Sequence, residues 1–135
     1  MQLSAGYGIS AVLSAAASGA EPTACAQWED IDITNGKKTP DQKETALTSD
    51  TPVCVVEDPD TNHVRKVLGI QYYNKDTSGT VVVTFARAAI SSAGVISAPL
   101  TLQALTLATL EVATYSPDHG WTCFNTAGQR KHTIT

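Results

Sequence analysis

The chain has 135 residues, of which 42% are hydrophobic and 16% charged, and its formal net charge is −4 at pH 7. This length suits one domain with a single core, because two domains would each lack the apolar residues that a core needs. The negative net charge excludes the basic surface that is typical of DNA- and RNA-binding proteins. We therefore expect one domain over residues 1–135 and no nucleic-acid partner.

The charged residues are unevenly distributed, and residues 1–20 and 88–110 contain none. Because the cores of protein interfaces are depleted of charge, both stretches are candidates for subunit contacts. Residues 88–110 are long enough to cross a membrane, but Pro99, Gln103 and repeated Ser and Thr are not typical of a spanning helix. Residues 1–20 lack the Lys or Arg that begins a secretory signal. We expect no membrane association.

Residues 1–20 combine small side chains with a few apolar ones. The apolar spacing within residues 8–18 fits a helix, and the same residues equally suit a strand, which we favour. We expect residues 1–20 to form an extended arm or an edge strand, lying against the sandwich or a neighbouring subunit. Five residues of this segment are expected at an interface: Leu3, Tyr7, Ile9, Val12 and Leu13.

Alternation with a period of two predicts the central strands. "CAQWEDIDI" alternates around Trp28, and "TPVCVVED" is a short β-branched strand. "HVRKVLGIQYY" and "TVVVTFA" are separated by "NKDTSG", whose composition is typical of turns, and we predict that they form a hairpin. In the second of these strands Val81, Val83 and Phe85 share one face.

The Leu-rich stretch after residue 95 changes its alternation twice, between Leu102 and Leu105 and again before Leu110. On a helix these leucines would scatter around the axis, so we expect strands with bulges or short turns at the two changes. This charge-free stretch supplies three more candidate interface residues: Val95, Ile96 and Leu100.

The segment "TYSPDHGWTCFNTAGQRK", residues 114–131, predicts two turns around a short strand. Pro117 suits the second position of a type I turn, and Gly120 can adopt the left-handed conformation that closes a hairpin loop. Asn125 and Gly128 repeat this pattern. We expect these four residues to have structural roles.

No pattern in the chain predicts catalysis or a cofactor. Asp118 and His119 are adjacent, so their side chains diverge, and no nucleophile motif accompanies them. Asp58, Asp60 and Asn62 resemble half of a calcium loop, but the glycine and the second acid that the loop requires are missing. The cysteines and histidines lack the spacing of zinc ligands: Cys25, Cys54, Cys123, His63, His119 and His132. We expect no catalytic residue, metal or cofactor.

Together these elements predict an all-β antiparallel β-sandwich, or a jelly-roll-like fold, with about eight short strands. The order of the features also resembles the small virion structural proteins of tailed bacteriophages. The segments that carry this resemblance are Met1-Gln2-Leu3, Trp28, Val53-Cys54-Val55-Val56, Arg65-Lys66-Val67, Tyr73-Asn74-Lys75-Asp76, Val81-Val82-Val83, Tyr115, Gly120-Trp121 and Asn125 to Lys131.

The resemblance implies a capsid decoration, or cement, protein that is located in the virion and assembled in the host cytoplasm. Its partners would be the major capsid protein or other virion proteins, and the chain would form a homo-oligomer. A neck, tail or fibre-adaptor protein is the alternative within the same class. A different alternative is a carbohydrate-binding β-sandwich that uses Trp121, Tyr72 or Tyr73 as a stacking platform.

Overall fold

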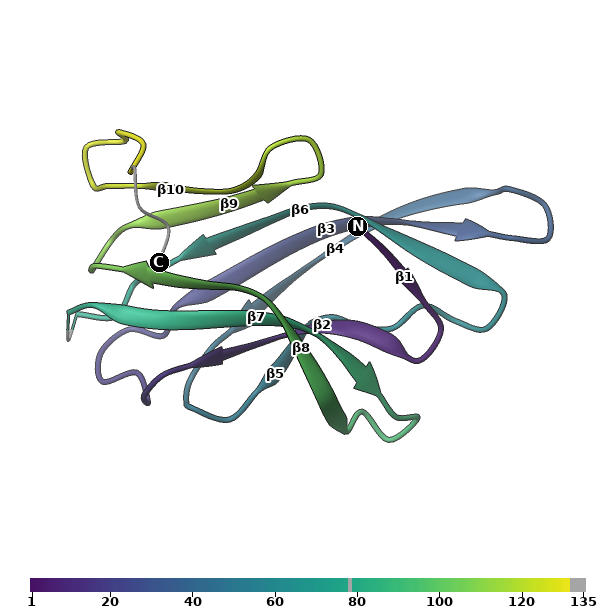
Figure 1. The fold of residues 1–135 in the computed structure, drawn as a ribbon, viewed down its shortest axis with the longest axis horizontal. Helices are drawn as coiled ribbons and strands as arrows, with labels where there is room; N and C mark the ends of the chain where they lie inside the picture. The colour runs from purple at the N-terminus through teal and green to yellow at the C-terminus, as the bar shows by residue number, and fades with distance from the viewer. Residues whose placement is uncertain (78, 132–135) are drawn as a thin grey trace.

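The structure is a computed structural model that describes residues 1–77 and 79–131. These residues form two antiparallel sheets, which Figure 1 shows as two layers. The strands are β1 (Gln2–Ser4), β2 (Tyr7–Leu13), β3 (Thr23–Asp32), β4 (Lys38–Ala46), β5 (Val53–Val56), β6 (His63–Tyr73), β7 (Val81–Ile90), β8 (Ile96–Leu107), β9 (Val112–Ser116) and β10 (Gly120–Phe124). The predicted all-β, sandwich-like fold is therefore confirmed, with ten strands rather than about eight. Within the described residues there is no helix long and apolar enough to span a membrane.

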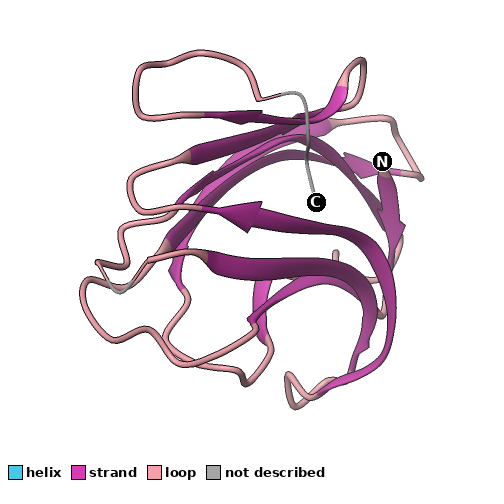
Figure 2. Ribbon diagram, turned by 60° about the vertical axis from the view of Figure 1, so that its left-hand side comes forward, coloured by secondary structure: helices cyan, strands magenta, loops and turns pink. Residues whose placement is uncertain are grey.

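The six-stranded sheet has the order β10-β9-β6-β3-β4, and β1 pairs with β6 outside this path. The four-stranded sheet has the order β5-β2-β7-β8. Three hairpins, β3–β4, β7–β8 and β9–β10, remain within one sheet, and every other connection passes from one sheet to the other. Figure 2 shows the loops of these connections at the ends of the two layers.

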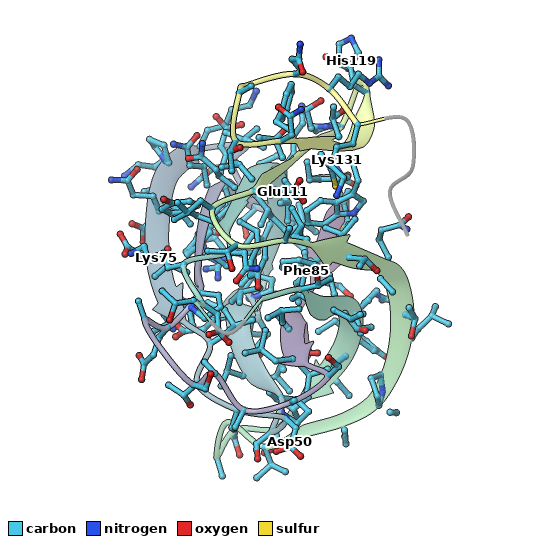
Figure 3. All side chains as sticks on the ribbon, turned by 90° about the vertical axis from the view of Figure 1, so that its left-hand side faces the viewer. Asp50, Lys75, Phe85, Glu111, His119 and Lys131 are labelled. Carbon is cyan, nitrogen blue, oxygen red and sulfur yellow. The ribbon has the colours of Figure 1, made fainter. Side chains whose placement is uncertain are left out.

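The core lies between the two sheets. Phe85 of β7 meets Tyr72 of β6 edge to face, with 6.0 Å between the ring centroids, and lies 4.6 Å from the ring centroid of Trp121 on β10. Val81 and Val83, on the same face as Phe85, are also buried, so the predicted facing of this strand is confirmed. Figure 3 shows Phe85 in the interior of the molecule.

The N-terminal segment is part of this core, and the expected arm or edge strand is wrong for β2, although β1 pairs only with β6 and lies at an edge. β2 lies inside the four-stranded sheet, between β5 and β7, which also confirms a strand rather than a helix. Ile9, Ala11 and Leu13 alternate along β2, so one face of the strand is apolar and buries against the other sheet. Leu3, Ile9 and Leu13 are at most 2% exposed, and these three predicted interface residues pack in the core of the chain itself.

The hairpin predicted between residues 63–73 and 80–86 does not form. β6 belongs to the six-stranded sheet and β7 to the four-stranded sheet, so the chain crosses the sandwich between them. Both strands have an apolar face, and each buries it by packing against the opposite sheet rather than by pairing with the other in one plane. A period of two predicts a strand with one buried face, but it does not distinguish these two arrangements.

Each sheet has an edge strand of a different character: β4, at an edge of the six-stranded sheet, is charged, and β8, at an edge of the four-stranded sheet, is not. β4 is an edge strand that the alternation did not predict, and it contains Lys38, Pro40, Asp41, Lys43 and Glu44. Charges and a proline at an edge oppose pairing with another chain. β8, an edge of the four-stranded sheet, contains no charged residue. Of the two changes predicted from the leucine alternation, the first lies beside a register shift at residues 101–103 and the second is the turn after β8, whereas the shift at residues 97–100 was not predicted.

Candidate interaction surfaces

The turn between β9 and β10 brings Ser116 and His119 together. The His119 backbone N–H donates to Ser116 Oγ at 3.2 Å, and His119 Nδ1 lies 3.5 Å from the same oxygen. Pro117 lies within the turn, and Gly120 closes it with a φ of 67°. Asp118 and His119 are exposed, and Figure 3 shows His119 projecting from one end of the molecule. A half-buried serine that caps its own turn, with no base other than an exposed histidine beside it, lacks the environment that activates a nucleophile.

The second turn is organised by Asn125. Its side-chain oxygen accepts the backbone N–H groups of Ala127 at 3.0 Å and Gln129 at 2.9 Å. Its backbone carbonyl accepts the Gly128 N–H at 2.9 Å, and Gly128 has a φ of 76°. Pro117, Gly120, Asn125 and Gly128 thus all lie in or directly beside turns.

No group of three His, Cys, Asp or Glu that could hold a metal occurs within residues 1–77 and 79–131; His132 lies outside the described residues. Asp58 Oδ2 accepts the Gly6 N–H at 3.2 Å, so this acid supports the turn between β1 and β2. Burial raises the pKa of the Cys54 and Cys123 thiols, which disfavours the thiolate form that reacts as a nucleophile.

The first candidate surface lies where the inner face of the four-stranded sheet becomes exposed. Strand register places Ile9, Arg87 and Leu100 side by side on β2, β7 and β8. Ile9 is fully buried, whereas Leu100 is 65% exposed. The guanidinium carbon of Arg87 lies 4.1 Å from the ring centroid of Tyr7, which is 40% exposed. Val95, which is 60% exposed, lies in the β7–β8 turn.

We call Tyr7, Arg87, Val95 and Leu100 the hairpin-end surface, because they lie at the β7–β8 turn end of the sheet, at the lower right of Figure 1. Arg87 is its one charged residue, and no carboxylate of a described residue lies within ion-pair distance of Arg87. Stacking on Tyr7 restricts the guanidinium. This surface can therefore receive an acidic side chain that is surrounded by apolar contacts.

The second candidate surface is the outer face of the six-stranded sheet. Ala24, Tyr72 and Ala113 point into the core. Side chains alternate along each strand, so the residues next to these three in the sequence point away from the core. One row of such residues crosses five strands from β4 to β10: Glu44, Cys25, Gln71, Thr114 and Thr122. We call this row, together with Gln42, Gln27 and Gly69 of the next row, the outer polar face.

Hollows adjoin one another on the outer polar face. The central hollow, of about 190 Å³, is lined by Gln27, Gly69, Gln71 and Thr114 among others. A hollow of about 420 Å³ shares Gln71 with it and extends to Tyr73. A third, of about 380 Å³, shares Gln27 and extends along β4. The outer polar face is therefore indented across several strands.

The predicted stacking platform is mostly wrong. Trp121 and Tyr72 point into the core and are 9% and 0% exposed, so neither presents a ring face to a ligand. Tyr73, the next residue along β6, is half-buried and lines the largest of the three hollows. Lys75 Nζ lies 5.9 Å from the centroid of the Tyr73 ring. Of the three aromatic candidates, Tyr73 alone remains at a hollow.

The remaining predicted interface residues lie in different places. Tyr7, Val95 and Leu100 belong to the hairpin-end surface, and Ile96 is half-buried beside Val95. Val12 is half-buried and pairs with Thr84, so it belongs to the outer face of the four-stranded sheet.

Sequence reasoning missed Arg87 and the outer polar face. The alternation in "TACAQW", where small apolar residues alternate with Thr, Cys and Gln, is the signal for a strand with an uncharged polar outer face. Arg87 gives no such signal, because its position over Tyr7 depends on the pairing of β2 with β7. Comparison of the chain with protein-family models, curated proteins and solved structures finds no match.

Proposed function

We propose that the chain is a structural protein of a tailed-bacteriophage virion, and that it decorates and stabilises the capsid by binding the major capsid protein or another virion protein. The observation that carries this proposal is the hairpin-end surface, which combines the stacked Arg87 with exposed apolar side chains from the charge-free stretches 1–20 and 88–110. Arg and Tyr are enriched among the residues that dominate interface energies. The resemblance in the order of sequence features supports the same class.

The hairpin-end surface suggests how such a protein holds its partner. Burial of Leu100 against a partner would contribute about 1.5–3 kcal/mol. Arg87 would pair with an acidic side chain of the partner, and its stacking on Tyr7 lowers the entropy lost when the pair forms. A closed ring of copies on the shell would repeat this contact, which gives a decoration protein its combined strength.

Mass spectrometry of purified virions, produced from the genome that encodes the chain, tests this proposal. We expect the chain in the particle at a fixed ratio to the major capsid protein, with hundreds of copies for a decoration protein. A dozen copies or fewer would favour the neck, tail or fibre-adaptor alternative. Absence of the chain from washed, infectious particles would contradict a structural role in the virion.

A further inference from the structure

The outer polar face contains hydrogen-bonding groups that the fold does not use. Within residues 1–77 and 79–131, the side-chain amides of Gln27, Gln42 and Gln71 make no hydrogen bond to protein. By contrast, the amide of Gln103 donates to Ala104 O at 3.0 Å, and Gln129 Oε1 accepts from Asn125 at 3.1 Å. Each unused amide offers two donors and an acceptor. The three amides therefore form a cluster of groups that can all bind the same ligand.

A glycine creates the indentation at the centre of this cluster. Gly69 lies opposite Gln27 in the sheet and lines the central hollow with Gln71 and Thr114. A Cβ atom built on Gly69 would meet only Tyr115 O, at 3.4 Å, which is an ordinary contact. Neither backbone strain nor crowding therefore requires glycine here. Its effect is to leave open a space that a side chain would fill.

The charges around the face indicate what kind of ligand it suits. The polar row has a single charged residue, Glu44, and the neighbouring Lys75 lies beside the Tyr73 ring. An anionic ligand requires a group of basic side chains, which this face lacks. Sugar hydroxyl groups act as both donors and acceptors, as do amides and threonine hydroxyls. The partly exposed Tyr73 ring offers an apolar surface to the C–H groups of a sugar ring.

We propose that the outer polar face binds a neutral oligosaccharide. Gln27, Gln71 and Thr114 exchange hydrogen bonds with its hydroxyl groups around the hollow at Gly69, and one sugar ring packs on Tyr73. This site lies on a different sheet from the hairpin-end surface, so ligand binding does not depend on the proposed role in the virion.

The test is a glycan array with neutral and acidic oligosaccharides, probed with the labelled full chain, followed by calorimetry on the bound glycans. Gly69→Val fills the hollow with a residue that suits a strand, and Gln71→Ala removes one amide. Lys66→Ala, at another exposed position of β6, is the matched control. Circular dichroism and thermal melting establish that each variant folds.

We expect the chain to bind one or more neutral oligosaccharides, and we expect Gly69→Val and Gln71→Ala each to weaken binding at least tenfold while Lys66→Ala leaves it unchanged. If Gly69→Val does not fold, Gln71→Ala decides the outcome. An array without neutral glycans bound, or with acidic glycans only, would overturn the proposal. Unchanged affinity in the folded variants would overturn the placement of the site.

Discussion

Asn74 joins the two layers of the sandwich through one buried side chain. Its Nδ2 donates to the backbone carbonyls of Leu107 and Ala108, each at 3.0 Å. Its backbone N–H donates to Glu111 O at 3.0 Å, and its carbonyl accepts the Leu110 N–H at 2.7 Å. The segment after β6, which has the composition of a hairpin turn, is thus fixed to the β8–β9 connection instead.

Replacement of Asn74 by alanine should lower the free energy of unfolding by about 2–4 kcal/mol, because a buried and a part-buried carbonyl lose this donor and a small cavity forms. Chemical denaturation with urea measures this change. Lys75→Ala, at the neighbouring half-buried position, should change stability by less than about 1 kcal/mol. Equal stability of the two variants would show that Asn74 does not hold the layers together.

Glu111, in the β8–β9 connection that Asn74 holds, makes further hydrogen bonds there. Its Oε2 accepts a hydrogen bond from Lys131 Nζ at 2.7 Å and from the Ala108 N–H at 2.9 Å, and Figure 3 shows Glu111 and Lys131 lying close together. Burial alone would raise the pKa of Glu111, but the two hydrogen bonds outweigh it, so the pKa lies below the ordinary value of 4.5. The carboxylate therefore stabilises the fold above that pH, and this contribution is lost as the pH falls through the lower folded-state value.

Glu111→Gln should consequently lower stability at pH 7 by about 1–3 kcal/mol, through loss of the charged hydrogen bonds. The difference from the unmodified chain should shrink as the pH falls below 4.5, because the native glutamate then becomes protonated as well. Thermal melting of both proteins between pH 7 and pH 3 measures this. A difference that persists unchanged at pH 3 would show that the charge of Glu111 does not stabilise the fold.

At the scale of the strand, Gly8 and Gly69 differ in whether the structure has room for a side chain at their position. A Cβ on Gly8 of β2 would lie 2.4 Å from Val56 O and 3.0 Å from Ile90 Cγ1, so the backbone of β5 would have to move. A Cβ on Gly69 of β6 would meet one atom at ordinary contact distance. The first glycine permits two segments to approach each other, and the second keeps a surface hollow open.

Gly8→Ala should therefore lower stability by about 1–3 kcal/mol through overpacking. Gly69→Ala should leave stability unchanged or raise it by about 0.4–1 kcal/mol, because alanine restricts the unfolded chain without straining the strand. Urea denaturation of the two alanine variants compares them directly. The reverse order of stabilities would mean that the close approach at Gly8 is relaxed in solution, or that Gly69 has a structural role.

Most strands could be predicted from the sequence, but their partners could not. The alternation of Val81, Val83 and Phe85 identifies the buried face of β7, and Gly120 and Gly128 mark the turns around β10. β4 was missed because an edge strand without a buried face has no apolar alternation. The apolar residues of β2 show that the segment must be covered, but they do not specify whether a neighbouring subunit or its own core covers it.

Which residues make up the two candidate surfaces depends on how the strands pair, even more than the fold does. The absence of charge in residues 88–110 predicts an interaction region, and Val95 and Leu100 could be named as candidates from it. Arg87 joins them only because register places it beside Leu100 and over Tyr7. The outer polar face likewise consists of residues from five strands that only the sheet order brings into one row.

At the scale of the whole molecule, the two surfaces lie on different sheets and differ in chemistry. The hairpin-end surface is apolar around a single arginine, whereas the outer polar face is uncharged apart from Glu44 and rich in amides and hydroxyls. The charged edge strand β4 opposes pairing of the six-stranded sheet with another chain. We therefore propose that the hairpin-end surface attaches the chain to the virion and that the outer polar face is free for a ligand.

Co-sedimentation of the purified chain with capsids that lack it tests the assigned attachment most directly. Leu100→Asp places a charge on the hairpin-end surface, and Ile33→Asp is the matched control, because Ile33 is 64% exposed but lies in the β3–β4 turn. We expect the unmodified chain and Ile33→Asp to sediment with the capsids, and Leu100→Asp, although folded, to bind at least tenfold more weakly. Equal binding of the two aspartate variants, or no binding of the unmodified chain, would contradict the account.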